Sequence, residues 1–210
     1  AYIIAGHSLR LEERKKKAAA AAEQRVKLTM DAGALDNRIR LLTEMEKEYE
    51  GFSKAVKTVM QARGSLRGLH GPVASLMKTD GKYSLAIEIA LGAGLQNIVV
   101  DREEDAKSAI SYLKQRDAGR ATFLPLTAIR GGELRQQGVE SEFGFVGLAS
   151  RLITFEEKYR NIFESLLGRT VIAEDMDCGI AMARKYQNAF RIVTLDGQVI
   201  NRGGSMTGGS

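Results

Sequence analysis

The sequence predicts an α/β protein with mixed (α+β) sheets, built as two pseudo-symmetric subdomains preceded by a coiled-coil helix. Three observations lead to this prediction: a segment that recurs after 76 positions, strand-like and helix-like stretches that alternate around each copy, and a heptad pattern that comes before both copies. Alternating strands and helices are typical of layered α/β folds. The predicted units are a coiled-coil arm at 1–52, a first subdomain at 53–136 and a second at 137–210.

The repeat is clearest where residues 71–92 align without a gap on residues 147–168. Seven of these 22 positions are identical, and both copies carry a Lys-Tyr pair, Lys82-Tyr83 and Lys158-Tyr159. Each copy spaces its apolar residues as one buried helical face and then continues into a β-branched strand. Two copies predict two similar subdomains, because a solenoid needs at least three stacked repeats.

The arm is predicted from residues 12–50, which contain no proline and a single glycine. Apolar side chains recur there every seven residues, at Leu28, Leu35, Leu42 and Tyr49. A helix of about 40 residues would span about 60 Å. That length favours a coiled-coil arm over an amphipathic helix that lies on its own domain. The first eight residues fit neither pattern, which leaves open that they are an appended remnant.

Each subdomain is expected to alternate strands and helices. The first is expected to hold a short helix ending near Gly64, a glycine-punctuated linker up to residue 70, a strand at 72–77, a helix at 82–92, a strand at 95–101, a helix at 103–114 and a strand at 121–126. The second is expected to hold a strand at 148–153, a helix at 157–167, a strand at 170–174, a helix at 179–186 and a strand at 190–195. Residues 127–143 are predicted to link the two, and Asp196-Gly197 signals a hairpin into 198–201.

The amino-acid composition limits the classes of function that are compatible with this chain. The chain is 44% apolar and 27% charged, with a net charge of +5, a mild basic bias that is compatible with nucleic acid. There is no apolar run long enough to span a bilayer, and the order of charges at the start is wrong for a signal peptide. The lone Cys178 excludes an internal disulfide and suits a reducing cytoplasm, and we interpret it as a packing residue rather than a reactive thiol.

No catalytic constellation can be assembled from the sequence. The only histidines, His7 and His70, lie far apart and in no metal-ligand spacing, and no nucleophile elbow or Walker A motif is present. Glu88 and Glu164 recur in the repeat, but recurring charges are more often the exposed face of a helix. We therefore predict no catalytic residue, no metal and no cofactor. The alternative is a small α/β enzyme or ligand-binding domain that uses the cleft between the subdomains.

Two further features suggest interfaces. The terminal glycine pairs Gly203-Gly204 and Gly208-Gly209 are either a flexible linker or part of an edge strand that pairs with a second molecule. Four cations without a neighbouring acid in the sequence are either a solvated surface or a phosphate-contacting patch. These cations are Lys54, Lys57, Arg63 and Arg67.

The order of several motifs resembles the hinge domain of bacterial SMC (structural maintenance of chromosomes) proteins. The motifs are YEGFSKAVKTVM, HGPVASLMKTDGKYSLAIEIALGAGLQNIVVD, GRATFLPL and GQVINRGGSMTGGS. The resemblance covers about residues 47–210, and residues 1–46 would be the end of the incoming coiled-coil arm.

The resemblance implies a non-catalytic homodimerisation module. In this family the first subdomain of one chain joins the second subdomain of the other, through a glycine-rich segment. The expected interface residues are Val199, Ile200, Gly203, Gly204, Gly208 and Gly209. Basic residues near the junction with the coil bind DNA in the family, and the matching positions here are Lys54, Lys57, Arg63 and Arg67.

The resemblance also implies a larger protein. It would be an ATPase through head domains absent from this chain, with kleisin-type subunits at those heads, and would organise chromosomal DNA in the cytoplasm at the nucleoid. SMC chains return from the hinge as a second helix, so an arm at 1–52 in a chain that stops at Ser210 is expected to lack an intramolecular partner. A remaining alternative is a monomeric DNA-binding module whose glycine tail is only a linker.

Overall fold

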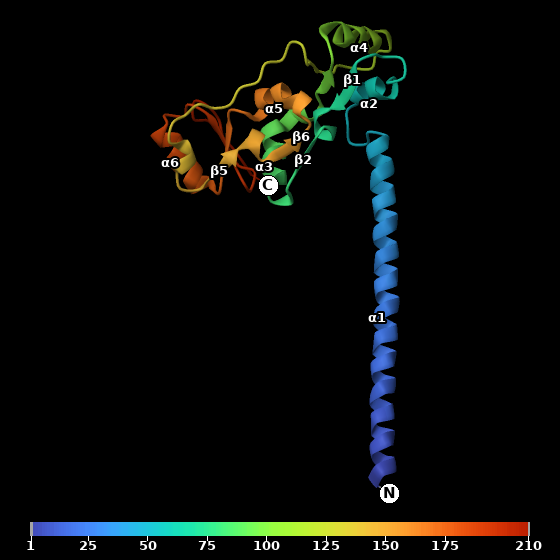
Figure 1. Cartoon of the computed structure of the whole chain (residues 1–210). Coiled ribbons are helices and arrows are strands. Elements are labelled where there is room, and N and C mark those ends of the chain that lie inside the picture. The colour runs from blue at the N-terminus through green and yellow to red at the C-terminus, as the bar shows by residue number, and fades with distance from the viewer. Residues whose placement is uncertain (1, 210) are drawn as a thin grey trace. The chain divides into compact units, whose positions relative to one another are not determined.

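A computed structural model describes residues 2–209. Its contacts divide the chain into two compact units, Ala1–Glu50 and Gly51–Ser210. The first unit is a single helix, α1 (Tyr2–Lys47), which is continuous along its length (Figure 1). It includes residues 2–8, which the heptad pattern leaves outside the arm. The seam residues Leu28 and Leu35 are each 60% exposed in the single chain, as expected of a coiled-coil helix without a partner.

The second unit contains a three-stranded sheet in the order β1-β3-β4. Strand β1 (Leu69–Pro72) runs antiparallel to β3 (Ile98–Val100), and β4 (Phe123–Pro125) runs parallel to β3. Two helices contact this sheet, α2 (Lys54–Gln61) and α4 (Glu103–Gln115). Helix α2 begins after Ser53, whose hydroxyl accepts a hydrogen bond from the Val56 amide at 3.3 Å.

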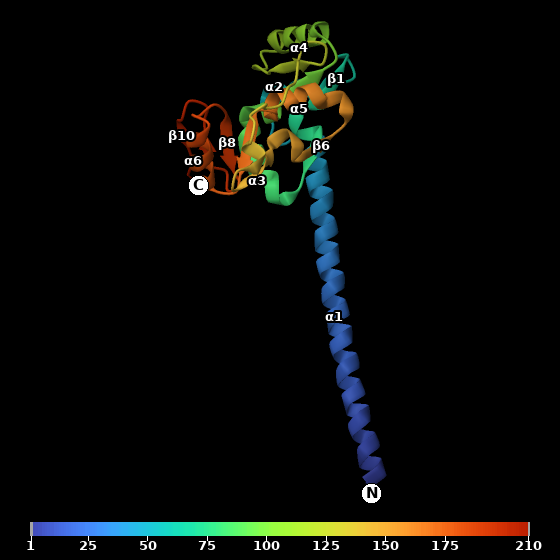
Figure 2. The ribbon, with the colours of Figure 1, turned by 60° about the vertical axis from the view of Figure 1, so that its left-hand side comes forward.

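A five-stranded sheet in the order β10-β9-β8-β7-β5 forms the other side of the unit. Its strands are β5 (Phe145–Leu148), β7 (Thr170–Ala173), β8 (Arg191–Thr194), β9 (Val199–Ile200) and β10 (Met206–Thr207). Strands β7 and β8 are parallel, and the other pairs are antiparallel. Helix α6 (Met176–Lys185) contacts this sheet (Figure 2). The Asp196-Gly197 hairpin is confirmed, with Gly197 at φ +84°.

A small two-stranded ladder joins the two copies of the repeat. Strand β2 (Met77–Thr79) pairs antiparallel with β6 (Ile153–Phe155) (Figure 1). Helices α3 (Gly81–Leu91) and α5 (Arg160–Leu167) follow these strands and contact each other. The two sheets are therefore connected through equivalent elements.

The predicted duplication is confirmed in the topology. The first sheet has one antiparallel and one parallel pair, and β5-β7-β8 repeats the same pairing. Even an irregularity recurs, because the register shift at Leu69/Gly71 has its counterpart at Phe145/Gly147. The second copy then adds β9 and β10 to its sheet, beside β8.

One hydrophobic core is shared by both halves. It includes Ile87 and Val99 from the first half and Phe163 and Val193 from the second, each no more than 1% exposed. The buried residues of a second cluster, around Met182, all come from the second half, and Leu134 of the linking segment packs against them. Because the main core crosses from one half to the other, the two halves stabilise each other. The boundary at 136/137 stays a prediction.

Several predicted elements differ from the structure. The strands predicted at 72–77 and 148–153 are each a strand, a 3₁₀ turn and a second strand, and the turns are η1 (Val73–Ser75) and η4 (Ala149–Arg151). Val73 and Ala149 are fully buried within these turns, so the apolar runs resembled uninterrupted strands. Two more 3₁₀ segments were missed, η2 (Gly92–Gln96) before β3 and η5 (Glu157–Tyr159) before α5.

Three residue-level expectations are corrected. The spacing of Ala106, Ile110 and Leu113 predicts that all three share one apolar face of this helix, but Ile110 is 53% exposed, because α4 buries Ala106, Ala109 and Leu113 instead. His70 lies in β1 rather than in a linker. Helix α6 begins earlier than predicted because the Asp175 carboxylate accepts a hydrogen bond from the Cys178 amide at 2.8 Å, as an N-cap does.

The segment between the two sheets is mostly irregular, but it is anchored. It contains one 3₁₀ turn, η3 (Val139–Ser141), and Val139 is buried. The Leu134 amide donates to the Gly168 carbonyl at 2.8 Å, and the Gly131 amide donates to the Asn161 side chain at 3.1 Å. The segment is therefore held against α5 at Gly131 and Leu134, and against the second cluster at Val139.

Candidate interaction surfaces

The terminal glycines flank an edge strand. Within the described residues, β10 pairs only with β9, through Met206↔Ile200 and Thr207↔Val199. The Asn201 amide donates to the Ser205 carbonyl at 2.8 Å, and antiparallel ladders alternate between hydrogen-bonded and non-bonded pairs. It follows that Thr207 bonds to β9, whereas the amide and carbonyl of Met206 point away from the sheet. The Met206 side chain is 53% exposed, so this edge is open.

The four glycines have distinct local roles. Gly203 and Gly204, at φ +89° and +100°, make the turn between β9 and β10, a conformation that favours glycine. A Cβ on Gly208 would lie 2.0 Å from the Gln198 side-chain oxygen. That oxygen accepts a hydrogen bond from the Gly209 amide at 2.9 Å. The segment is thus hydrogen-bonded to its own sheet, while the outward backbone edge of β10 stays open.

Val199 and Ile200 occupy the inner strand β9. They are 4% and 3% exposed, and their side chains pack into the chain's own core. An interface at this end of the sheet would involve them through the backbone ladder rather than through their side chains. Met206, which sequence reasoning missed, holds the outer position.

The first sheet also has an open edge, at β4. The Ile98 amide donates to the Thr122 carbonyl and the Leu126 amide to the Val100 carbonyl, both at 2.9 Å. In a parallel pair these bonds leave the backbone groups of Phe123 and Pro125 facing away from β3. Pro125 has no amide to donate, which is typical of an edge strand.

The basic residues predicted to contact DNA lie on α2 and in the loop that follows it. Lys54 donates to the Asp117 carbonyl at 3.5 Å, and Arg63 donates to the His70 carbonyl at 3.0 Å. Lys57 is half-buried, whereas Lys54, Arg63 and Arg67 are exposed. The structure brings the four side chains into one region of the unit, along one helix and the loop that follows it.

Folding changes the charge balance of this region in two ways. Arg120, which sequence reasoning missed, lines a hollow of about 380 Å³ together with Ser53 and Val56. The carboxylate of Asp105 lies against Gly68, where a Cβ would be only 2.2 Å from Oδ2. An acid therefore borders Gly68, the chain neighbour of Arg67. The sequence could not show either neighbour, because both come from segments tens of residues away.

A hydrogen-bonded chain connects the two halves. His70 Nε2 lies 2.5 Å from Asp101 Oδ1, and His70 Nδ1 lies 2.8 Å from the Tyr159 hydroxyl. A carboxylate can only accept, so in the neutral ring Nε2 carries the proton and Nδ1 accepts from Tyr159. Tyr159 is 4% exposed. These two hydrogen bonds therefore fix the orientation of the buried Tyr159 side chain.

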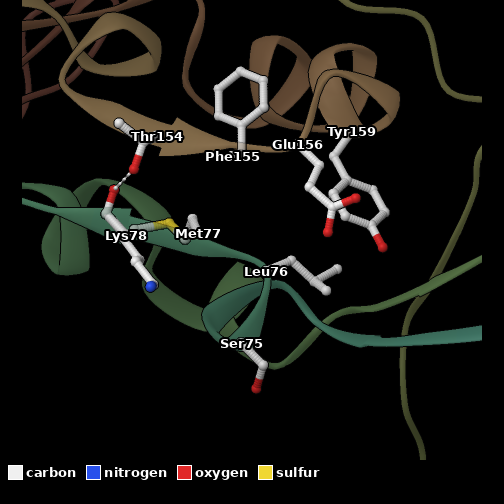
Figure 3. Close-up of a pocket in the computed structure, with 8 residues that line it drawn as sticks. All are labelled: Ser75, Leu76, Met77, Lys78, Thr154, Phe155, Glu156 and Tyr159. Atoms are coloured by element: carbon white, nitrogen blue, oxygen red, sulfur yellow. Dashed lines mark hydrogen bonds between the residues drawn. The ribbon is translucent and has the colours of Figure 1, made fainter.

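Two hollows flank the β2–β6 ladder. The first, of about 420 Å³, is lined by Ser75, Leu76, Met77, Lys78, Thr154, Phe155, Glu156 and Tyr159 (Figure 3). The second, of about 500 Å³, is lined by Lys78, Thr79, Asp80, Tyr83, Arg151, Leu152, Ile153 and Thr154. Moving each lining residue of the first by 76 positions along the chain gives the lining of the second. The hollows are therefore equivalent sites of the internal repeat.

Each hollow is lined by a tyrosine whose ring is contacted by the lysine that precedes it in the sequence. The Lys158 ammonium lies 5.1 Å from the Tyr159 ring centroid and 3.3 Å from Glu156, whose hydrogen bond raises the pKa of Lys158. The Lys82 ammonium lies 4.8 Å from the Tyr83 ring centroid, and a hydrogen bond with Tyr83 raises the pKa of Lys82. The recurring Lys-Tyr pair of the sequence is thus a recurring cation–π contact.

The described residues offer little for catalysis by metals or thiols. Among residues 2–209 no group of three or more His, Cys, Asp or Glu side chains could hold a metal ion. The hydrogen bond from the Cys178 thiol to Asp175 raises the pKa of Cys178, which disfavours the nucleophilic thiolate. Within the same residues, no helix is both long enough and apolar enough to cross a bilayer.

Comparison with known proteins decides the family. The family described as SMC proteins Flexible Hinge Domain matches residues 66–183, more than half of the chain. The chain belongs to the SMC hinge family. The resemblance noted from the motifs is confirmed. The matched span ends before β8, so the glycine segment lies beyond it.

Curated relatives of the SMC hinge are much longer than this chain. The chromosome partition protein Smc of Bacillus subtilis is 45% identical over 173 residues, which cover 81% of this chain and 15% of that protein. The Smc protein of Methanocaldococcus jannaschii is 42% identical over 200 residues, covering 95% of this chain and 16% of that protein. The chain therefore spans about 15% of the length of these relatives.

Solved SMC hinge structures share the fold. The Geobacillus stearothermophilus hinge domain, described as an asymmetric dimer, is 40% identical with a TM-score of 0.79, covering 83% of this chain and 73% of that one. The Pyrococcus furiosus hinge with an extended coiled coil is 31% identical with a TM-score of 0.64, covering 95% of this chain and 74% of that one. The predicted fold class, two similar α/β subdomains after a coiled-coil helix, is confirmed.

Proposed function

We propose that this chain is the homodimerisation module of a chromosome partition protein. The observation that carries the proposal is the open edge of β10, where the amide and carbonyl of Met206 face away from their own sheet. Exposed strand edges are templates for pairing with another chain. The similar Geobacillus stearothermophilus hinge is described as a dimer, which supports the same role here.

The partner of this edge is proposed to be β4 of a second copy. Phe123 offers an outward amide and carbonyl on that strand, whereas the Pro125 carbonyl already accepts from the Ala128 and Ile129 amides. Strand β4 occupies the place in the first sheet that β8 occupies in the second. In the second sheet that place is followed by β9, so the fold already accommodates a further strand there. Two such contacts, related by a twofold axis, would close a ring of two chains. Stable homodimers bury about 2,000 Å² or more, and two contacts make that area accessible.

The glycine segment is proposed to permit close approach in this contact. Gly203, Gly204, Gly208 and Gly209 carry no side chain that would hold a second backbone away. Val199 and Ile200 support β10 from the inner strand. Catalysis is not part of the proposed role of this chain.

The test is the solution mass by light scattering of the chain and of two variants at one position. Met206→Pro removes the outward amide and leaves the Thr207 bonds to β9, whereas Met206→Ala removes only the side chain. We expect a dimer of about 46 kDa, twice the 23.0 kDa chain, for the parent and for Met206→Ala. Met206→Pro is expected to be a monomer with an unchanged circular dichroism spectrum. A parent that is monomeric, or a Met206→Pro variant that stays dimeric, would overturn the proposal.

DNA binding is proposed as a secondary role. The contacts would be to phosphates, made by Lys54, Lys57, Arg63 and Arg67 with the addition of Arg120, and therefore independent of base sequence. In the longer protein we propose ATPase heads with kleisin-type subunits and a cytoplasmic location at the nucleoid. The relatives' name, chromosome partition protein, supports this placement.

A further inference from the structure

The two equivalent hollows beside the β2–β6 ladder differ at one position that changes their chemistry. Where the first hollow has Ser75, the second has Arg151. The Arg151 guanidinium binds Glu133 at 2.6 Å, which raises the pKa of Arg151. The second hollow is therefore lined by a guanidinium of its own chain. The first has the corresponding leucine, tyrosine and carboxylate, Leu76, Tyr159 and Glu156, together with Phe155 in place of Thr79, and no guanidinium in its lining.

The first hollow has two groups that can share one cation. The Lys158 ammonium lies 3.3 Å from the Glu156 carboxylate and 5.1 Å from the Tyr159 ring centroid. A single positive charge can thus reach both groups. The Lys158 and Glu156 side chains are 51% and 72% exposed, and ion pairs this exposed hold weakly. An incoming cation can therefore replace the lysine.

The rest of the hollow suits a long side chain. The Tyr159 ring is held in place through His70 and Asp101, so it needs no reorganisation on binding. Leu76 and Met77 provide an apolar wall for methylene groups. Figure 3 shows the Lys78 ammonium at the other end of the hollow from Glu156 and Tyr159, where it does not occupy the cation position.

We propose that the first hollow binds an arginine side chain from an extended segment of a partner protein. The guanidinium would stack on the Tyr159 ring and bond to Glu156 in place of Lys158, and its stem would lie along Leu76 and Met77. Arginine fits better than lysine because its planar fork stacks on aromatic rings and bonds carboxylates in pairs. This proposal is independent of the dimer contact.

The test uses a methyl reporter inside the hollow. The full chain is labelled at its methionine methyl groups, and the Met77 signal is assigned with Met77→Leu. The probe is the peptide acetyl-Gly-Arg-Gly-amide, compared with the same peptide carrying citrulline, which has the shape of arginine without its charge. We expect a saturable shift of the Met77 signal with the arginine peptide and at least about tenfold weaker binding of the citrulline peptide.

The repeat provides matched control variants. Glu156→Gln is expected to weaken binding about tenfold, whereas Asp80→Asn at the equivalent position should leave it unchanged. Lys158→Ala removes the competing ammonium and should strengthen binding about threefold, whereas Lys82→Ala should not. Ser75→Arg, which copies the second hollow, is expected to block the probe. These residues are exposed or half-buried, so the variants should fold.

Several results would overturn the proposal. They are a Met77 signal that does not respond, equal binding of the citrulline peptide, and equal effects of Glu156→Gln and Asp80→Asn. A Ser75→Arg variant that binds like the parent would also overturn it.

Discussion

Lys78 and Thr154 lie opposite each other in the β2–β6 ladder, and each is the other's equivalent in the 76-residue repeat. Their neighbours obey the same relation, since Met77 pairs with Phe155, the equivalent of Thr79. A local twofold axis therefore passes between Lys78 and Thr154. This is the geometry of an isologous contact, built within one chain. It explains why the shared core and the paired hollows both lie next to this ladder.

The shared core predicts that a cavity on one side destabilises the whole unit of residues 51–210. Phe163 is fully buried, contacts the core of both halves and stacks on Phe155 at 4.8 Å between ring centroids. Phe163→Ala is expected to lower the free energy of unfolding by about 3–5 kcal/mol, measured by urea denaturation. Phe143, which is 87% exposed, is the matched control, and Phe143→Ala should change it by less than about 0.5 kcal/mol. Equal effects of the two variants would contradict the core assignment.

Gly168 is predicted to be required for space rather than for its backbone angle. Its φ is −66°, open to any residue, but a Cβ there would lie 2.1 Å from the Gly132 carbonyl oxygen. Gly168→Ala should therefore push away the linking segment and destabilise the unit by about 1–3 kcal/mol. Gly81→Ala is the control, because a Cβ there meets nothing within 4 Å and alanine favours helix. Thermal unfolding of both variants checks this, and a Gly168→Ala variant as stable as the parent would refute it.

Glu133 is predicted to give the unit an acid-sensitive component of stability. Its hydrogen bonds with Arg151 lower the pKa of Glu133 below the ordinary value of 4.5. A lowered folded-state pKa means that the stabilisation is present above the unfolded-state pKa and is lost as pH falls through the folded-state value. The urea midpoint should therefore fall more steeply below about pH 4.5 in the parent than in Glu133→Gln. Glu140 is the control, because its side chain is 67% exposed and lies farther from Arg151, at 3.7 Å. Glu140→Gln should keep the parent's dependence of the urea midpoint on pH.

The acid beside Gly68 makes the DNA proposal specific. Lys54 donates to the Asp117 carbonyl, whereas Arg67 is the chain neighbour of Gly68, which that acid contacts. We expect Lys54→Gln to weaken the binding of all DNA sequences alike and to reduce the slope of log K against log salt concentration by about one. Arg67→Gln should have a smaller effect on both. Fluorescence anisotropy at several salt concentrations measures this. Exposed Arg184 on α6 is the control, and an equal loss in Arg184→Gln would mean that binding depends only on net charge.

The sequence by itself determined the architecture. Period and spacing are local properties, so the heptads predicted α1, the alternation predicted the α/β layers, and the 76-residue offset predicted the duplication. The motif order also led to the correct family. These patterns can be read from the sequence because the side chains of a helix or a strand repeat their direction every few residues, whatever surrounds that element.

Only the tertiary structure decided which surfaces are left open. The turns at Val73 and Ala149 are buried, so in the sequence they looked like strand interiors, and Val199 and Ile200 turned out to lie one strand inside the edge. Arg120 lines a hollow with Ser53 and Val56, and Asp105 contacts Gly68, although these residues are too far apart in the sequence for a local pattern to show it. The pairing of Lys78 with Thr154 likewise depends on how the two copies fold against each other. Which strand lies at the edge of a sheet, which residues are neighbours in space and how charges balance on a surface all depend on long-range packing. A local periodicity in the sequence does not encode that packing.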